Sequence, residues 1–143
     1  MSTRRVSPEE AKSLLDEGYQ YVDVRTEAEY AAGHAAGAQN VPYAFAGAGG
    51  MTANPEFVSM MAKLYGKDAA LVLGCKSGGR SAKAATLLEA AGFSKLADLK
   101  SGFDGARDAF GQITEKGWAA AGLPVETTTP GGSFAELAPK ARG

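Results

Sequence analysis

The residues best suited to chemistry lie in the stretch VLGCKSGGRS, residues 72–81, which holds the only cysteine of the chain, Cys75. Arg80 follows five positions later, and Lys76 and two glycines stand between them. A thiolate is a strong nucleophile, whereas a free thiol is mostly protonated at neutral pH. Backbone N–H groups curled around an anion, with cations nearby, would favour the thiolate and also hold an anionic substrate. Two chemistries use such a loop, namely the cleavage of phosphate esters and the transfer of sulfur.

The elements on either side of this loop would position the cysteine. The apolar run AALVLG, residues 69–74, is typical of a buried parallel strand. Residues 81–91 are predicted to form a helix that ends at Gly92. The positive end of this helix would face the loop. Gly78 and Gly79 would adopt the positive φ angles of an anion-binding turn at little cost.

A lone cysteine is more often a small buried residue of the core than a nucleophile. Here the strand before it, the Gly-Gly-Arg sequence after it and the helix behind it favour a nucleophile. Cysteine phosphatases have the pattern C-x5-R, preceded by a histidine, whereas this loop reads C-x4-R and is preceded by Gly74. The shorter loop makes a tighter pocket, which suits attack on sulfur better than attack on a phosphoryl group.

Composition excludes several classes of function. The chain has 143 residues, 45% hydrophobic and 22% charged, which fits one globular domain. A formal charge of −1 argues against a nucleic-acid partner, and no apolar run approaches the roughly 20 residues that span a membrane. One cysteine excludes an internal disulfide framework and a metal site built on paired cysteines. Because the N-terminus also lacks the apolar segment of a secretion signal, we expect a soluble, cytoplasmic protein without a metal or a cofactor.

Helices and strands are predicted to alternate along the chain. Capping boxes at Ser7–Glu10 and Thr26–Glu29 predict two helix starts, and the stretch YQYVDVR between them is typical of a strand. This alternation predicts an α/β domain with a mostly parallel sheet, whose ligands bind at the carboxyl ends of the strands. Other predicted elements are short strands at 38–42 and 95–99, a surface loop at 44–54, a helix at 54–65, Gly-broken helical segments from 100 to 125, and a mobile tail at 127–143.

Four stretches together resemble the rhodanese-like sulfurtransferases of the single-domain type. YVDVRTEAEYAAGHAAGAQNVP is similar to the first signature of that family, and GCKSGGRS is similar to its active-site loop. GFSKLADLKSGFDG resembles a strand followed by the family's Gly-Gly-aromatic turn, with Ser101 in place of the first glycine, and GWAAAGLPV resembles its closing segment. The resemblance covers about residues 5–125. A departure is the insertion of roughly ten residues near 106–116.

The resemblance implies a three-layer α/β/α domain over residues 1–126, with a central, mostly parallel sheet of about five strands, followed by the tail. It also implies a persulfide mechanism with Cys75 as the catalytic residue. The thiolate would take the outer sulfur of thiosulfate and pass it to a thiophilic acceptor such as cyanide or a thiol. This is covalent catalysis in two half-reactions.

The same resemblance makes the loop the substrate-binding site. Lys76 would hold the dianion thiosulfate in preference to the monoanion mercaptopyruvate, or would be only a solvated surface charge. Arg80 would bind donor oxygens with its forked donors, or would brace the loop against a carboxylate. The substrate-binding residues are expected to be Lys76, Ser77, Gly78, Gly79, Arg80 and Ser81.

Asp23 and Arg25 come at the end of a neighbouring predicted strand. The resemblance gives them a role in supporting the pocket, and an ordinary structural ion pair is the alternative. His34 is the only histidine of the chain. In the family this position belongs to a turn away from the nucleophile, so we do not expect a Cys–His pair.

Three other functions compete with a sulfurtransferase. A persulfide carrier would deliver sulfur to a thiol-bearing partner protein, and the absence of a second cysteine is compatible with that function. A phosphatase or arsenate reductase is disfavoured by the spacing of the loop. An inactive regulatory domain is disfavoured because Cys75 and the loop glycines are intact.

Overall fold

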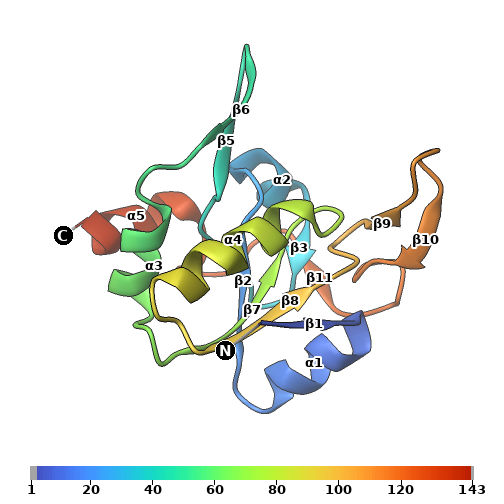
Figure 1. The fold of residues 1–143 in the computed structure, drawn as a ribbon, viewed down its shortest axis with the longest axis horizontal. Helices are drawn as coiled ribbons and strands as arrows, with labels where there is room; N and C mark the ends of the chain where they lie inside the picture. Colours follow the sequence, from blue (N-terminus) through green and yellow to red (C-terminus); the bar gives the residue numbers. More distant parts are fainter. Residues whose placement is uncertain (1–2, 143) are drawn as a thin grey trace.

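Five parallel strands form the central sheet of the computed structural model, which describes residues 3–142 (Figure 1). Helices cover both faces of this sheet, as the three-layer prediction requires. The strand order, β1-β8-β7-β2-β4, places β7 in the middle, and the loop that begins with Cys75 follows β7. In spatial order the strands are β1 (Arg4–Val6), β8 (Lys95–Leu99), β7 (Ala70–Gly74), β2 (Gln20–Asp23) and β4 (Gln39–Asn40).

Both predicted capping boxes are present at helix starts. The Ser7 side chain accepts the Glu10 backbone N–H at 3.1 Å, and Glu10 accepts the Ser7 N–H at 2.8 Å. Thr26 and Glu29 make the same reciprocal pair. The helices are α1 (Pro8–Asp16), α2 (Glu27–Ala32), α3 (Phe57–Leu64), α4 (Gly79–Ala90) and α5 (Phe134–Arg142).

The two faces of the sheet carry separate hydrophobic cores. On one face, α3, α4 and α5 contribute Phe57, Leu88 and Leu137 to a core that includes the strand residue Leu73. On the other face, α1 and the segment after the insertion cover Val72 and other strand residues. Buried strands of this kind need apolar residues on both sides, which explains why AALVLG reads as a continuous apolar run. Among the described residues, no helix is both long and apolar enough to cross a membrane.

Two predictions of local structure are wrong. Residues 44–54 form a hairpin of β5 (Ala44–Gly47) and β6 (Gly50–Ala53) instead of an irregular loop. The region of the insertion is not helical, because β9 (Gly105–Arg107) and β10 (Ile113–Lys116) pair as a second antiparallel hairpin. The Asp108 carboxylate accepts backbone N–H groups two and four residues later, which closes its turn.

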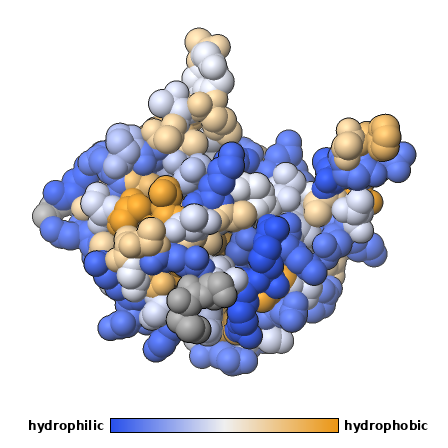
Figure 2. All heavy atoms as spheres, in the orientation of Figure 1, coloured by the Kyte–Doolittle hydropathy of each residue, from blue (hydrophilic) through white to orange (hydrophobic). Residues whose placement is uncertain are grey.

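Both hairpins project from the body of the molecule (Figure 1). The surface view shows weakly apolar residues along the β5–β6 projection, and apolar residues at the tip of the β9–β10 projection above hydrophilic ones (Figure 2). Met51 on β6 is 53% exposed, and Phe110 at the turn between β9 and β10 is 90% exposed.

The predicted tail, residues 127–143, contains the helix α5, which packs against α3. Phe134, Leu137 and Ala138 are buried at the spacing of one helix face. Ser133 and Glu136 form an N-terminal cap of the same type as those at the starts of α1 and α2. The high content of Pro and Gly concealed this helix. Ahead of it, β11 (Val125–Glu126) pairs with β3 (His34–Ala35).

Candidate active site

Cys75 lies where the central strand β7 ends and the loop to α4 begins. Its side chain is buried, with 1% relative exposure. The residue before it must be small, because a Cβ atom on Gly74 would overlap the hydroxyl and ring of Tyr21 on β2. The cysteine therefore sits at the carboxyl edge of the parallel sheet, where such folds bind ligands.

Two groups of the loop contact the Cys75 sulfur. The backbone N–H of Gly78 donates to Sγ at 3.1 Å, and the Ser81 Oγ lies 3.5 Å from Sγ. Gly78 is the N-cap of α4 and has a φ of +101°, a left-handed conformation that favours glycine. The same angle expected at Gly79 is not found, because Gly79 is already the first residue of the helix.

The turn after β8 supports the loop from outside. Phe103 N–H donates to the Cys75 carbonyl at 2.8 Å, and Asp104 N–H donates to the Lys76 carbonyl at 2.8 Å. Gly102 allows this approach, because a Cβ atom there would overlap the Lys76 backbone. Ser101, which replaces the glycine of the family pattern, is buried beside it. Contact with the loop therefore requires the second glycine of the pattern, Gly102, and not the first.

The two cations of the loop have different surroundings. Lys76 is exposed, whereas Arg80 makes a bidentate ion pair with Glu29, at 2.7 and 3.0 Å. Burial alone would raise the pKa of Glu29, but the hydrogen bonds from Arg80 and Thr26 and the charge of Arg80 lower it to about 2. Of the two roles considered for Arg80, bracing the loop against a carboxylate is the one that the structure displays.

Asp23 and Arg25 form a buried ion pair, with Nη2 of Arg25 2.7 Å from Oδ2 of Asp23. Burial opposes the charge of Arg25, but Asp23 outweighs this effect and the pKa of Arg25 is raised. Arg25 also donates to the Gly33 carbonyl at 2.7 Å, and its guanidinium lies 4.5 Å from the ring centre of Phe103. These contacts hold the pair in place. The pair borders the loop, because Arg25, Phe103 and Lys76 line one surface cavity of about 220 Å³.

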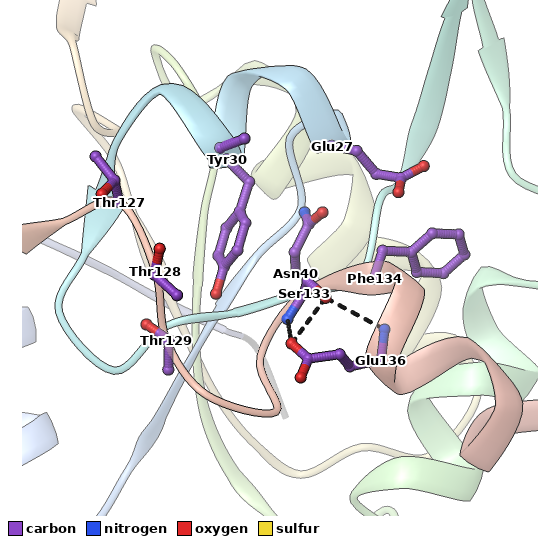
Figure 3. A pocket seen from close by; sticks show the side chains of 10 residues that line it. Glu27, Tyr30, Asn40, Thr127, Thr128, Thr129, Ser133, Phe134 and Glu136 are labelled. Atoms are coloured by element: carbon purple, nitrogen blue, oxygen red, sulfur yellow. Dashed lines mark hydrogen bonds between the residues drawn. The ribbon is translucent and has the colours of Figure 1, made fainter.

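His34 is occupied elsewhere in the fold. One ring nitrogen lies 2.8 Å from the Tyr30 carbonyl oxygen, the other lies 2.8 Å from Thr129 Oγ1, and the ring stacks on Tyr30. These partners hold it at the junction of α2 with the C-terminal segment. A larger cavity of about 370 Å³ lies in the same region, between α2 and residues 127–136 (Figure 3). Cys75 does not line this cavity.

Sequence reasoning missed two residues beneath the loop, Asp98 on β8 and Arg5 on β1. The Ser81 hydroxyl lies 2.5 Å from Oδ1 of Asp98, and Nε of Arg5 lies 2.9 Å from Oδ2. Arg5 also donates to the Gly78 carbonyl at 3.3 Å. The available signal was a charged residue in the middle of the apolar strand KLADL, since buried carboxylates are rare unless they have partners. Within residues 3–142 no cluster of His, Cys, Asp and Glu side chains could hold a metal ion.

The parallel sheet and the cysteine loop before α4 define a class of α/β protein. Comparison with known proteins identifies the family. The model of the rhodanese-like domain matches residues 7–109, and the chain belongs to this family. It is 41% identical to the "Thiosulfate sulfurtransferase 16, chloroplastic" of Arabidopsis thaliana over 85% of this chain and 91% of that protein. It is 33% identical to the "Thiosulfate sulfurtransferase GlpE" of Pseudomonas fluorescens over 71% of this chain and 82% of that protein. The crystal structure of Rv0390 from M. tuberculosis superposes with a TM-score of 0.73 at 28% identity, covering 90% of this chain and 100% of that one.

Proposed function

We propose that this protein is a sulfurtransferase that moves the outer sulfur of thiosulfate to cyanide or a thiol through a persulfide on Cys75. The observation that carries the proposal is the position of the Cys75 sulfur, which accepts the Gly78 N–H at 3.1 Å at the start of α4. That environment favours an anion on sulfur. The relatives named thiosulfate sulfurtransferase support the same activity.

In the first half-reaction the Cys75 thiolate attacks the outer sulfur of thiosulfate. The S–S bond of thiosulfate breaks, and its electron pair leaves with sulfite. A new S–S bond joins the outer sulfur to Cys75, so atoms and charge balance without an added proton or reductant. The persulfide places its outer sulfur about 2 Å beyond Sγ, the length of an S–S bond.

In the second half-reaction the acceptor attacks this outer sulfur. The bond to Cys75 breaks and its electron pair returns to Cys75 as the thiolate, while cyanide becomes thiocyanate or a thiol becomes a persulfide. The thiol belongs either to a small molecule or to a protein. No second thiol of this chain competes for the sulfur, because Cys75 is its only cysteine.

Lys76 is the loop cation we assign to the donor. Its side chain is exposed on the rim of the cavity that Phe103 and Asp104 also line. Arg80 is held by Glu29 and contributes its charge from a fixed position. A dianion gains more than a monoanion from these two cations, which favours thiosulfate over mercaptopyruvate as the donor.

Intact-protein mass spectrometry tests this function. After incubation with thiosulfate we expect the protein to gain the mass of one sulfur atom and to lose it again when cyanide is added. Cys75→Ser should show no gain while keeping the circular dichroism spectrum of the native fold. If the wild-type protein gains no sulfur, or if Cys75→Ser gains it equally, the proposed function is wrong.

A further inference from the structure

The Cys75 sulfur is one end of a buried polar chain that leads away from the loop. From Sγ the chain continues to the Ser81 Oγ at 3.5 Å, then to Oδ1 of Asp98 at 2.5 Å. The other carboxylate oxygen of Asp98 accepts from Arg5 at 2.9 Å. Ser81 and Asp98 are 0% and 1% exposed, respectively.

The chemistry of these groups fixes the direction of each hydrogen bond. An ionised carboxylate only accepts, and a serine hydroxyl has a single hydrogen. The Gly78 carbonyl also lies 3.4 Å from Oγ, but Asp98 is nearer and charged. The Ser81 hydrogen therefore points to Asp98, and a lone pair of Oγ faces the sulfur. The thiol hydrogen of Cys75 can then point to Ser81, so that one continuous line of hydrogen bonds joins the thiol to the carboxylate.

We propose that Ser81 and Asp98 accept the thiol proton of Cys75, so that the reactive thiolate forms inside the protein by transfer along this chain. The proposal rests on the sulfurtransferase function proposed above. The S–H bond breaks as its proton moves to Ser81 Oγ, and the former Ser81 hydroxyl proton moves to Oδ1 of Asp98. The products are a thiolate and a neutral carboxyl group, and Ser81 is again a hydroxyl that now donates to the sulfur. Ser81 contacts the reacting atom, and Asp98 is a positioning residue that acts through it.

The groups around the chain suit this transfer. Burial raises the pKa of Asp98, against the opposing effects of Ser81 and Arg5, and thereby makes the neutral carboxyl group easier to form. The thiolate that results keeps the Gly78 N–H and the charge of Arg80 nearby. Tyr21 on β2 stays neutral, since burial raises its pKa well above the usual range. The negative charge of Asp23 is balanced by its ion pair with Arg25.

The far end of the chain opens to a separate cavity. Asp98 and Arg5 line a surface cavity of about 230 Å³ between the N-terminal strand and α4, together with Thr3 and Glu89. A proton on Asp98 can reach water there without passing the rim of the loop, where the anionic donor would bind. The donor would therefore approach the cysteine from one surface of the protein, and the proton would leave from another.

The test is the rate of Cys75 alkylation by iodoacetamide, a neutral reagent, measured against pH in the wild-type protein and in three variants. When two groups share a proton, the thiolate form persists between the two titrations of the pair. The wild-type rate should therefore keep a plateau on the acid side of the thiol titration. Asp98→Asn and Ser81→Ala should lose the plateau, with about a tenfold lower rate for each pH unit below the thiol titration. Glu89→Gln removes a carboxylate from the same cavity without touching Ser81, and it should keep the plateau.

A wild-type profile without a plateau would overturn the proposal, and so would a plateau that survives in Ser81→Ala. A plateau lost equally in Glu89→Gln would also overturn it, because the effect would then follow the charge of the cavity. Ser81→Ala removes one buried hydroxyl and decides the question even if Asp98→Asn fails to fold. Alkylation does not require sulfur transfer. Absence of a persulfide in the wild-type protein would thus refute the proposed function, whereas the pH profile separately tests the proton path.

Discussion

Arg80 and Lys76 carry the same charge in one loop, but their neighbours give them different tasks. Arg80 is 19% exposed at its side chain and holds both oxygens of Glu29, which also caps α2. Bidentate pairs of this kind combine charge with fixed geometry. The first turn of α4 is thereby joined to the start of α2, and the loop between Cys75 and Arg80 is held at both of its ends. Lys76 is left to face solvent.

Replacement of Glu29 by Gln tests this brace through its pH dependence. A carboxyl whose pKa is lowered by folding stabilises the protein above its unfolded value, and this contribution is lost as the pH falls through the folded value. For Glu29 these values are 4.5 and about 2. After allowance for partial exposure, we expect Glu29→Gln to lower the free energy of unfolding by about 1–2 kcal/mol at pH 7.

The measurement is urea unfolding of both proteins between about pH 7 and pH 2, and the difference between them should shrink below pH 4.5. Glu17→Gln, at an exposed carboxylate after α1, is the matched control and should change stability by no more than about 0.5 kcal/mol. A difference for Glu29→Gln that is constant over the whole range would show that the ion pair is not its source.

At the scale of elements, α5 completes the core that α3 and α4 build on one face of the sheet. Leu137 is 4% exposed, and its neighbours on the same helix face are also buried. The Ser133–Glu136 cap fixes where the helix begins. A segment of polar composition is thus held in place by a few apolar side chains at the correct spacing.

Leu137→Ala should therefore destabilise the protein by about 2–4 kcal/mol, because the shortened side chain leaves a cavity in this core. The free energy of unfolding in urea is the quantity to compare. Lys140→Ala changes an exposed residue of the same helix and should cost at most about 0.5 kcal/mol. Equal and small effects of both variants would mean that α5 is not part of the stable core in solution.

At the scale of the whole molecule, the two cores share one sheet. Trp118, the only tryptophan, is buried in the core on the face opposite Leu137. Its indole N–H donates to the Pro124 carbonyl at 2.7 Å, and its ring meets Tyr21 edge to face. Strand β7 contributes residues to both cores. If the helices on one face unfold, they expose a strand on which the other core also depends.

We expect the two faces to unfold in one transition. In Leu137→Ala, the midpoint read by Trp118 fluorescence should fall by the same amount as the midpoint read by far-ultraviolet circular dichroism. The two probes report the opposite face and the whole backbone, so their agreement is informative. If the Trp118 transition keeps its wild-type midpoint while the circular dichroism midpoint falls, the cores are independent units.

Several features of this protein could be predicted from short stretches of sequence. The capping boxes at Ser7 and Thr26, the buried strand before Cys75 and the helix after it depend on residues within a few positions of one another. The errors fall where local signals conflict. The hairpins at 44–53 and 105–116 lie in Gly-rich or charged stretches, and α5 lies in a segment rich in Pro and Gly.

The sequence by itself thus determined the family, the alternation of elements and the cysteine loop, because each depends on neighbouring residues. Only the tertiary structure decided which partners the loop residues have. Arg80 meets Glu29 across 51 positions, and Ser81 meets Asp98 across 17. Such pairs form because parallel strands bring their carboxyl ends to one edge of the sheet, and the order of the strands in the sheet is not a property of any local stretch.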